Sequence, residues 1–163
     1  MNTVVSDAGP LIGLARINRI ELPRELFGSL IIPPAVFDEM KVSSTRPGAQ
    51  AIAEAVKAGW INILPLKKKA AAKGLLSLVD IGEAEAIQLA IEQKAAFLLI
   101  DDKKGRKVAK RLGLRIVGIG GLLIAAEQSG LIENVAPVID DLARAGYRLS
   151  SALSQRIIEL ASG

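Results

Sequence analysis

The chain has 163 residues and a formal net charge of +4, and half of its residues are hydrophobic. This length and composition predict one folded domain with an aliphatic core and exclude a disordered chain. The lack of cysteine and histidine excludes disulfides, thiolate metal sites, Ser-His-Asp catalysis and HExxH zinc sites.

Short aliphatic runs alternate along the chain with segments of helical pattern. Four of the runs are apolar throughout, as expected for parallel strands covered on both faces. The run at 60–65 alternates more and predicts an edge strand or a short extended segment. In chain order, the sequence predicts a strand at 3–7, helices at 10–17 and 22–27, a strand at 30–33, helices at 33–41 and 46–59, the run at 60–65, a helix at 80–94, a strand at 97–101, a helix at 103–113, a strand at 115–119, and helices at 120–130, 134–145 and 150–161.

This order of strands and helices predicts the fold class. It indicates an α/β protein, a three-layer α/β/α sandwich around a central parallel sheet of four or five strands with right-handed crossovers. We expect residues 1–163 to form a single domain, with a helical C-terminal extension over 134–163. The segment 66–79 contains four lysines, and it predicts a mobile connector or a basic lobe.

The sequence contains no membrane-spanning pattern. No apolar run approaches the roughly 20 residues that a membrane span requires, and the N-terminus "MNTVVSDAGP" lacks the basic region of a signal peptide. We therefore expect a cytoplasmic protein without membrane contact. Its basic charge permits nucleic-acid binding without requiring it.

Acidic residues come from four separate segments. Asp7 ends the first predicted strand, and Asp101 and Asp102 end the strand at 97–101. Glu39 lies in the helix after the second strand, and Glu83 opens the helix that precedes "FLLID". Because ligands of open parallel sheets bind beyond the carboxyl ends of the strands, we expect these carboxylates to meet at one edge of the sheet.

Each acid also has a purely structural interpretation. Asp7 could cap the helix near Pro10, and Asp101 or Asp102 could cap the helix that follows them. Glu83 lies in a first helical turn, where the helix dipole favours acids, and Glu39 could be solvated. As a cluster, however, carboxylates repel one another. Mg²⁺ or Mn²⁺, which prefer oxygen ligands, would relieve that repulsion and suit phosphate chemistry.

A basic stripe follows the paired aspartates. Its members recur at helical spacing, so several share one face: Lys103, Arg106, Lys107, Lys110 and Arg111. The stripe is either an ordinary solvated helix face or a surface that binds the phosphates of RNA. Arg106 could hold a scissile phosphate or pair with Asp102 or Glu83.

Three glycines follow the last predicted strand, at Gly118, Gly120 and Gly121. Their spacing differs from the GxGxxG pattern of dinucleotide-binding loops, and no Walker lysine accompanies them. A tight turn from strand to helix is the better interpretation.

Several segments together resemble the PIN-domain superfamily, in particular its VapC-like branch of small prokaryotic proteins grouped as a domain of unknown function (DUF3368-like). They are "VVSDAGPLIGLARI", "IIPPAVFDEM", "DIGEAEAIQLA", "LLIDDKKGRKVAKRLGL" and "IVGIGGLLIAAEQSGLI". The resemblance implies a Rossmann-like fold with four acids that bind Mg²⁺ or Mn²⁺ and cleave RNA. By motif, these acids are Asp7, Glu39, Glu83 and Asp101, with Asp38 and Asp102 as neighbouring alternatives.

The resemblance predicts a metal-dependent endoribonuclease, the toxin of a type II toxin–antitoxin pair. Its partners would be RNA, a small antitoxin and a second copy of the chain. Two other functions fit the same residues. One is a binding or regulatory module with this fold and no turnover, and the other is a phosphoacceptor domain with acids at its strand ends.

Overall fold

The computed structural model describes residues 3–40 and 45–163. Within them, five short strands form one sheet with the order β3-β2-β1-β4-β5, and every neighbouring pair is parallel. The strands are β1 (Val4–Ser6), β2 (Leu30–Ile32), β3 (Ile61–Ile63), β4 (Phe97–Leu99) and β5 (Ile116–Val117). The chain starts in the middle of the sheet, builds outward to β3, and returns to β4 and β5 on the other side.

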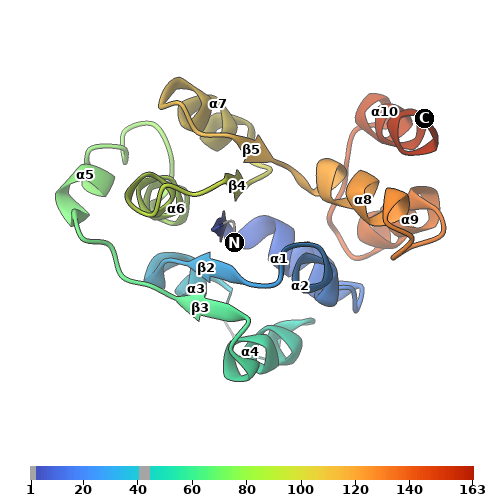
Figure 1. Ribbon diagram of the computed structural model, residues 1–163, viewed down its shortest axis with the longest axis horizontal. Helices are drawn as coiled ribbons and strands as arrows, with labels where there is room; N and C mark the ends of the chain where they lie inside the picture. Colours follow the sequence, from blue (N-terminus) through green and yellow to red (C-terminus); the bar gives the residue numbers. More distant parts are fainter. Residues whose placement is uncertain (1–2, 41–44) are drawn as a thin grey trace.

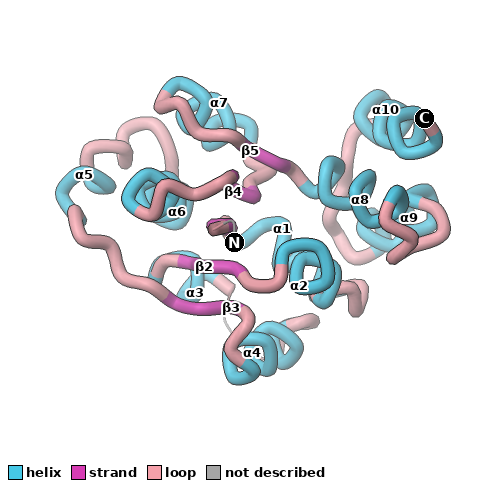
Figure 2. Tube along the Cα trace, viewed as in Figure 1, coloured by secondary structure: helices cyan, strands magenta, loops and turns pink. Residues whose placement is uncertain are grey.

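Helices cover both faces of this sheet, which confirms the predicted α/β/α sandwich (Figures 1 and 2). Because the direction of strand addition reverses after β3, right-handed crossovers place the later helices on the opposite face from the earlier ones. The helices are α1 (Ala8–Arg16), α2 (Glu21–Phe27), α3 (Pro34–Glu39), α4 (Ala49–Ala58), α5 (Lys69–Lys73), α6 (Ile81–Glu92), α7 (Lys103–Arg111), α8 (Ile119–Gln128), α9 (Val135–Arg144) and α10 (Ser151–Ser162).

The core between the layers is aliphatic. The central strands contribute Val5, Leu98 and Leu99, and helices contribute side chains such as Leu11 and Ile87, all fully buried. Burial of one such side chain stabilises the fold by roughly 1.5–3 kcal/mol. The continuous apolar runs in the sequence therefore mark strands that are covered on both faces.

The structure shows what two segments with alternative predictions form. The run at 60–65 contains β3, which is an edge strand of the sheet. The segment 66–79 contains the helix α5, which packs against α6. The backbone N–H groups of Lys67 and Lys68 donate to the two carboxylate oxygens of Glu92, at 2.7 and 2.9 Å. The last residue of the helix predicted at 33–41 lies outside the described residues.

The C-terminal helices α8, α9 and α10 pack together beside the sheet, as the orange and red segments of Figure 1 show. Ile157 and Ala161 are the buried residues of α10, which packs on α8 and α9. The predicted extension over 134–163 thus corresponds to α9 and α10. Among the described residues, no helix combines the length and hydropathy that a membrane crossing requires.

Candidate functional site

Strand pairing brings two of the acidic segments to one place. β1 and β4 are neighbours, with Ser6 opposite Leu99, and the N–H of Asp7 donates to the carbonyl of Leu99 at 2.8 Å. The chain therefore leaves the carboxyl ends of both strands side by side. This arrangement places Asp7 next to the loop that carries Asp101 and Asp102.

Asp7 is a buried carboxyl group without a hydrogen-bond partner on one oxygen. Its residue is 6% exposed, and its Oδ1 contacts no donor in the structure. It occupies the N-cap position of α1 but makes no side-chain capping bond, so capping does not explain it. The pKa of Asp7 is raised to about 7. Burial is the main cause, the hydrogen bond from the Ala8 N–H lowers the pKa, and the charges of Glu39, Asp80 and Asp102 raise it.

Glu83 belongs to a capping box at the start of α6. Its N–H donates to Asp80 Oδ1 at 2.8 Å, and the Asp80 N–H donates to Glu83 Oε1 at 3.0 Å. This supports the structural interpretation of Glu83, but the side chain also faces the cluster. The pKa of Glu83 is raised to about 8, first by burial and then by a hydrogen bond to the carboxylate of Asp102. Burial thus favours the protonated form of Glu83, and Asp102 keeps the charged form.

Glu39 reaches the cluster from the C-terminal end of α3. A Cβ atom at Gly82 would lie 2.5 Å from Glu39 Oε1, so the glycine leaves room for this carboxylate beside Asp80. Burial, and then the charge of Asp80, raises the pKa of Glu39. The N–H of Ala35 donates to Glu85 Oε1 at 3.1 Å, which fixes α3 against α6.

The paired aspartates face different surroundings. Asp102 lies with Glu83, caps α7 by accepting from the Gly105 N–H at 2.9 Å, and carries a lowered pKa. Burial works to raise that pKa, but hydrogen bonds from Gly105 and Glu83 outweigh it. Asp101, which the sequence places first as a ligand, accepts instead from the Ile119 N–H at 2.8 Å and from the hydroxyl of Tyr147.

Tyr147 was not anticipated from the sequence. Its hydroxyl donates to Asp101, and its ring lies on α1, where a Cβ atom at Gly13 would be 2.9 Å from the ring carbon Cδ2. Burial raises the pKa of Asp101, although Tyr147, the Ile119 N–H and the charge of Arg106 each lower it in part. Asp80 was also missed, although its spacing of three residues from Glu83 is a recognisable capping-box signal.

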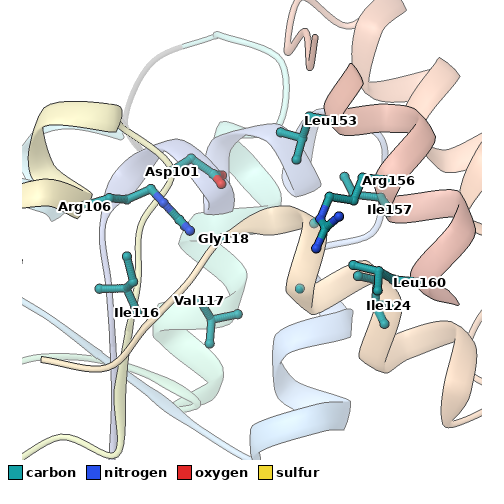
Figure 3. Close-up of a pocket in the computed structure, with 12 residues that line it drawn as sticks. Asp101, Arg106, Ile116, Val117, Gly118, Ile124, Leu153, Arg156, Ile157 and Leu160 are labelled. Atoms are coloured by element: carbon teal, nitrogen blue, oxygen red, sulfur yellow. The ribbon is translucent and has the colours of Figure 1, made fainter. Parts of the chain in front are cut away.

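The basic residues predicted to bind substrate divide into two groups. Lys103, Lys107 and Lys110 are exposed on α7. Arg106 turns inward, and its Nη1 donates to the carbonyl of Ile100 at 3.0 Å. Figure 3 shows Arg106 beside Asp101 at the wall of a pocket, and its charge lowers the pKa of Asp101. Among the described residues, Arg106 forms no ion pair with Asp102 or Glu83.

The acids suit a hard cation in their chemistry. Within residues 3–40 and 45–163, no group of three or more acidic side chains is already arranged as a ligand set. The donors are nevertheless all oxygen atoms, one Asp7 oxygen is unpartnered, and burial leaves protons on Asp7 and Glu83 that a cation would replace. Asp7, Glu39, Glu83 and Asp102 are the side chains that could hold such an ion.

Comparison with protein families places the chain beside known proteins. A family model described as a PIN domain (DUF3368) matches residues 3–163. The curated proteins contain no match to the chain.

Proposed function

Because the chain belongs to the PIN-domain family, whose members are generally nucleases, we propose that it is an endoribonuclease that uses Mg²⁺ or Mn²⁺. The observation that carries this proposal is the cluster at the ends of β1 and β4. There, Asp7 is buried with an unpartnered oxygen, and Glu39, Asp80 and Asp102 act on its pKa. An apolar replacement would serve folding better than such a cluster does.

The proposal assigns roles to the acids. Asp7, Glu39, Glu83 and Asp102 would hold the metal ion, which when bound polarises a phosphoryl oxygen and activates water. Asp101 lies one residue from Asp102 and, through Tyr147 and the Ile119 N–H, has a fixed direction. It would border the cluster on the side of Arg106.

The helix α7 would hold the RNA backbone. It begins at Asp102 and carries Lys103, Lys107 and Lys110 exposed to solvent. Contacts between lysine and phosphate give affinity without sequence selection and weaken as salt rises. RNA cleavage is therefore expected to slow at high ionic strength.

Cleavage of a labelled single-stranded RNA in Mn²⁺ tests the nuclease. Asp7→Asn removes a ligand charge, so we expect the rate to fall roughly a hundredfold or more, as when one charge-stabilising group of an active site is lost. Glu39→Gln should behave alike. Asp38→Asn is the matched control, because it changes the neighbouring exposed acid of the same helix and should cleave normally. Undiminished cleavage by Asp7→Asn, or by the wild type in EDTA, would contradict the proposal.

We extend the proposal to a toxin of a type II pair that acts in the cytoplasm, with a small antitoxin and a second copy of the chain as partners. Its support is the resemblance of the chain to VapC toxins. Expression in a bacterial host should arrest growth, and the Asp7→Asn variant should not. Growth that is equal with both variants would count against the toxin role.

One observation favours the alternative of a binding module without turnover. Asp101 is already engaged by Tyr147, and the described acids do not form a ready ligand set. Calorimetry separates the two functions. A heat of binding for Mn²⁺ at millimolar concentration, lost in Asp7→Asn, supports the nuclease, and no binding by the wild type supports the module.

A further inference from the structure

A pocket of about 460 Å³ lies beside the acid cluster, between the turn from β5 into α8 and the C-terminal helix α10. Asp101 and Arg106 line one wall, and Leu153, Arg156 and Leu160 of α10 line the other (Figure 3). Its size falls within the range of small-ligand sites. Asp101 of the pocket and Asp102 of the acid cluster are consecutive residues, so the two sites lie next to each other in the chain.

Two guanidinium groups reach this pocket from opposite walls. Arg106 lies beside Asp101, and its Nη1 donates to the Ile100 carbonyl. Arg156 is exposed, and within the described part of the chain it makes no hydrogen bond or ion pair. An unpaired arginine whose planar group offers five donors suits a phosphate or the edge of a base.

The remaining surfaces of the pocket are apolar or bare backbone. Leu153 and Leu160 are 44% and 48% exposed, although both are large hydrophobic residues, and they face the glycine turn at 118–121. Gly118 lets Asp101 and Arg106 lie close to the backbone, because a Cβ atom there would be 2.6 Å from Asp101 Oδ1 and 2.7 Å from Arg106 Nη1. A flat, partly apolar group could therefore lie between these two polar side chains and the leucines of α10.

These features together fit one kind of ligand. A nucleotide has a flat base for the leucine side chains, amino groups that could donate to Asp101, and a phosphate for the arginines. An acidic peptide fits less well, because its carboxylates would suit the arginines but it has no flat base for the leucine side chains. A ligand strand that crosses the acid cluster also reaches this pocket next.

We propose that the pocket binds one nucleotide of the RNA strand adjacent to the bond that is cleaved, with Arg156 as a substrate-binding residue contributed by α10. This proposal rests on the proposed ribonuclease function, since it assigns a subsite of the same site. It gives the C-terminal helix a direct part in substrate binding.

Binding of a short labelled single-stranded RNA to the Asp7→Asn protein, which removes turnover, tests the subsite. Adding Arg156→Ala should raise Kd roughly tenfold, as expected for one charge-assisted contact, and should lower the salt slope by about one. Arg156→Lys should keep the salt slope and lose part of the affinity. Arg19→Ala is the control, because it removes the same charge at the turn between α1 and α2 and should change Kd less than twofold.

Nuclear magnetic resonance with nucleoside monophosphates locates the contact. The amide signals of Gly118, Gly120 and Gly121 should shift in the wild type, and less in Arg156→Ala. Equal weakening by Arg156→Ala and Arg19→Ala would reduce the effect to net charge and overturn the proposal. Shifts with a polyglutamate peptide but with no nucleotide would also overturn it and assign the pocket to a protein.

The two proposals fail separately. RNA that binds through Arg156 but is never cleaved contradicts the nuclease and leaves the pocket assignment standing. If Arg156→Ala and Arg19→Ala cleave RNA at the same metal-dependent rate, the pocket assignment is contradicted and the nuclease proposal stands.

Discussion

Tyr147 joins two parts of the chain that are far apart in sequence. Its hydroxyl bonds Asp101 at the end of β4, and its ring covers Gly13 of α1. The single tyrosine of the chain thus helps to fix both the direction of Asp101 and the start of the segment that leads to α10. Gly13 is needed because the ring occupies the space that a methyl group would take.

Gly13→Ala should therefore destabilise the protein. The new Cβ atom would lie 2.9 Å from the Tyr147 ring, and overpacking of this kind costs roughly 1–3 kcal/mol. Gly9→Ala is the matched control on the same helix, since its Cβ atom would lie 3.9 Å from the Tyr147 hydroxyl; its change should be under about 1 kcal/mol and stabilising. Denaturant unfolding measures both variants, and equal stabilities would contradict the packing described for Tyr147.

At the residue scale, the sequence predicted the acids better than their contacts. Asp7 and Glu83 could be found because strand ends and helix starts are local signals, and the topology brings them to one edge. Asp102 caps α7, which is one of the two alternatives that the sequence offered. The contacts of Asp101 with Tyr147 and of Asp102 with Glu83 could not be found, because these partners lie 46 and 19 residues away in the chain. Their roles as metal ligands stay predictions.

At the scale of elements, side-chain carboxylates hold backbone segments in place. Glu85 accepts from the N–H of Ala35 and fixes α3, which carries Glu39, against α6. Glu92, at the other end of α6, accepts from the N–H groups of Lys67 and Lys68 and fixes the start of the α5 segment. The helix α6 therefore holds both α3 and the start of the α5 segment in place.

Glu92→Ala should loosen the segment 66–79 without unfolding the sheet. Removing the carboxylate leaves two backbone N–H groups without their acceptor, and α5 alone is too short to be stable in water. Hydrogen exchange and trypsin cleavage at Lys67–Lys73 should both increase. Glu54→Ala on α4 is the control, since within the described residues Glu54 bonds only the exposed side chain of Gln50. If residues 66–79 stay as protected in Glu92→Ala as in the wild type, Glu92 does not have this role.

The elements that could be predicted are those whose order depends on local sequence. The strands and long helices follow from local apolar runs, and their predicted places agree with the structure to within a few residues. The state of 66–79 could not be predicted, because its order depends on Glu92 and on packing against α6. The sequence of this lysine-rich segment carries no local signal for such an anchor.

At the scale of the whole molecule, the buried acids at one edge of the sheet lower the stability of the metal-free fold when they are charged. The pKa of Asp7 is raised to about 7 and that of Glu83 to about 8. Between the pKa of each group in the unfolded chain and its raised pKa in the fold, the folded protein therefore binds more protons than the unfolded chain. Stability is therefore greatest below about pH 4 for these two groups, and it is lost as pH rises to about 8.

Metal binding should reverse this loss. In EDTA, we expect Tm to fall on the order of 5 °C between pH 5 and pH 8 through these groups, and Mn²⁺ at millimolar concentration should restore it at pH 8 but not at pH 5, where protons occupy the carboxyls. Thermal unfolding across pH measures this. Asp7→Asn should flatten both the pH and the metal dependence, and an identical response in this variant would show that Asp7 is not the group concerned.

Asp101 lines the nucleotide pocket, whereas its neighbour Asp102 hydrogen-bonds Glu83 of the acid cluster. An RNA strand across this edge would have its pocket contacts on only one side of the broken bond. The two cleavage products would then leave at different rates, and the fragment that ends in the pocket would compete with new substrate. Turnover in such an enzyme is set by the departure of one fragment and not by bond breaking.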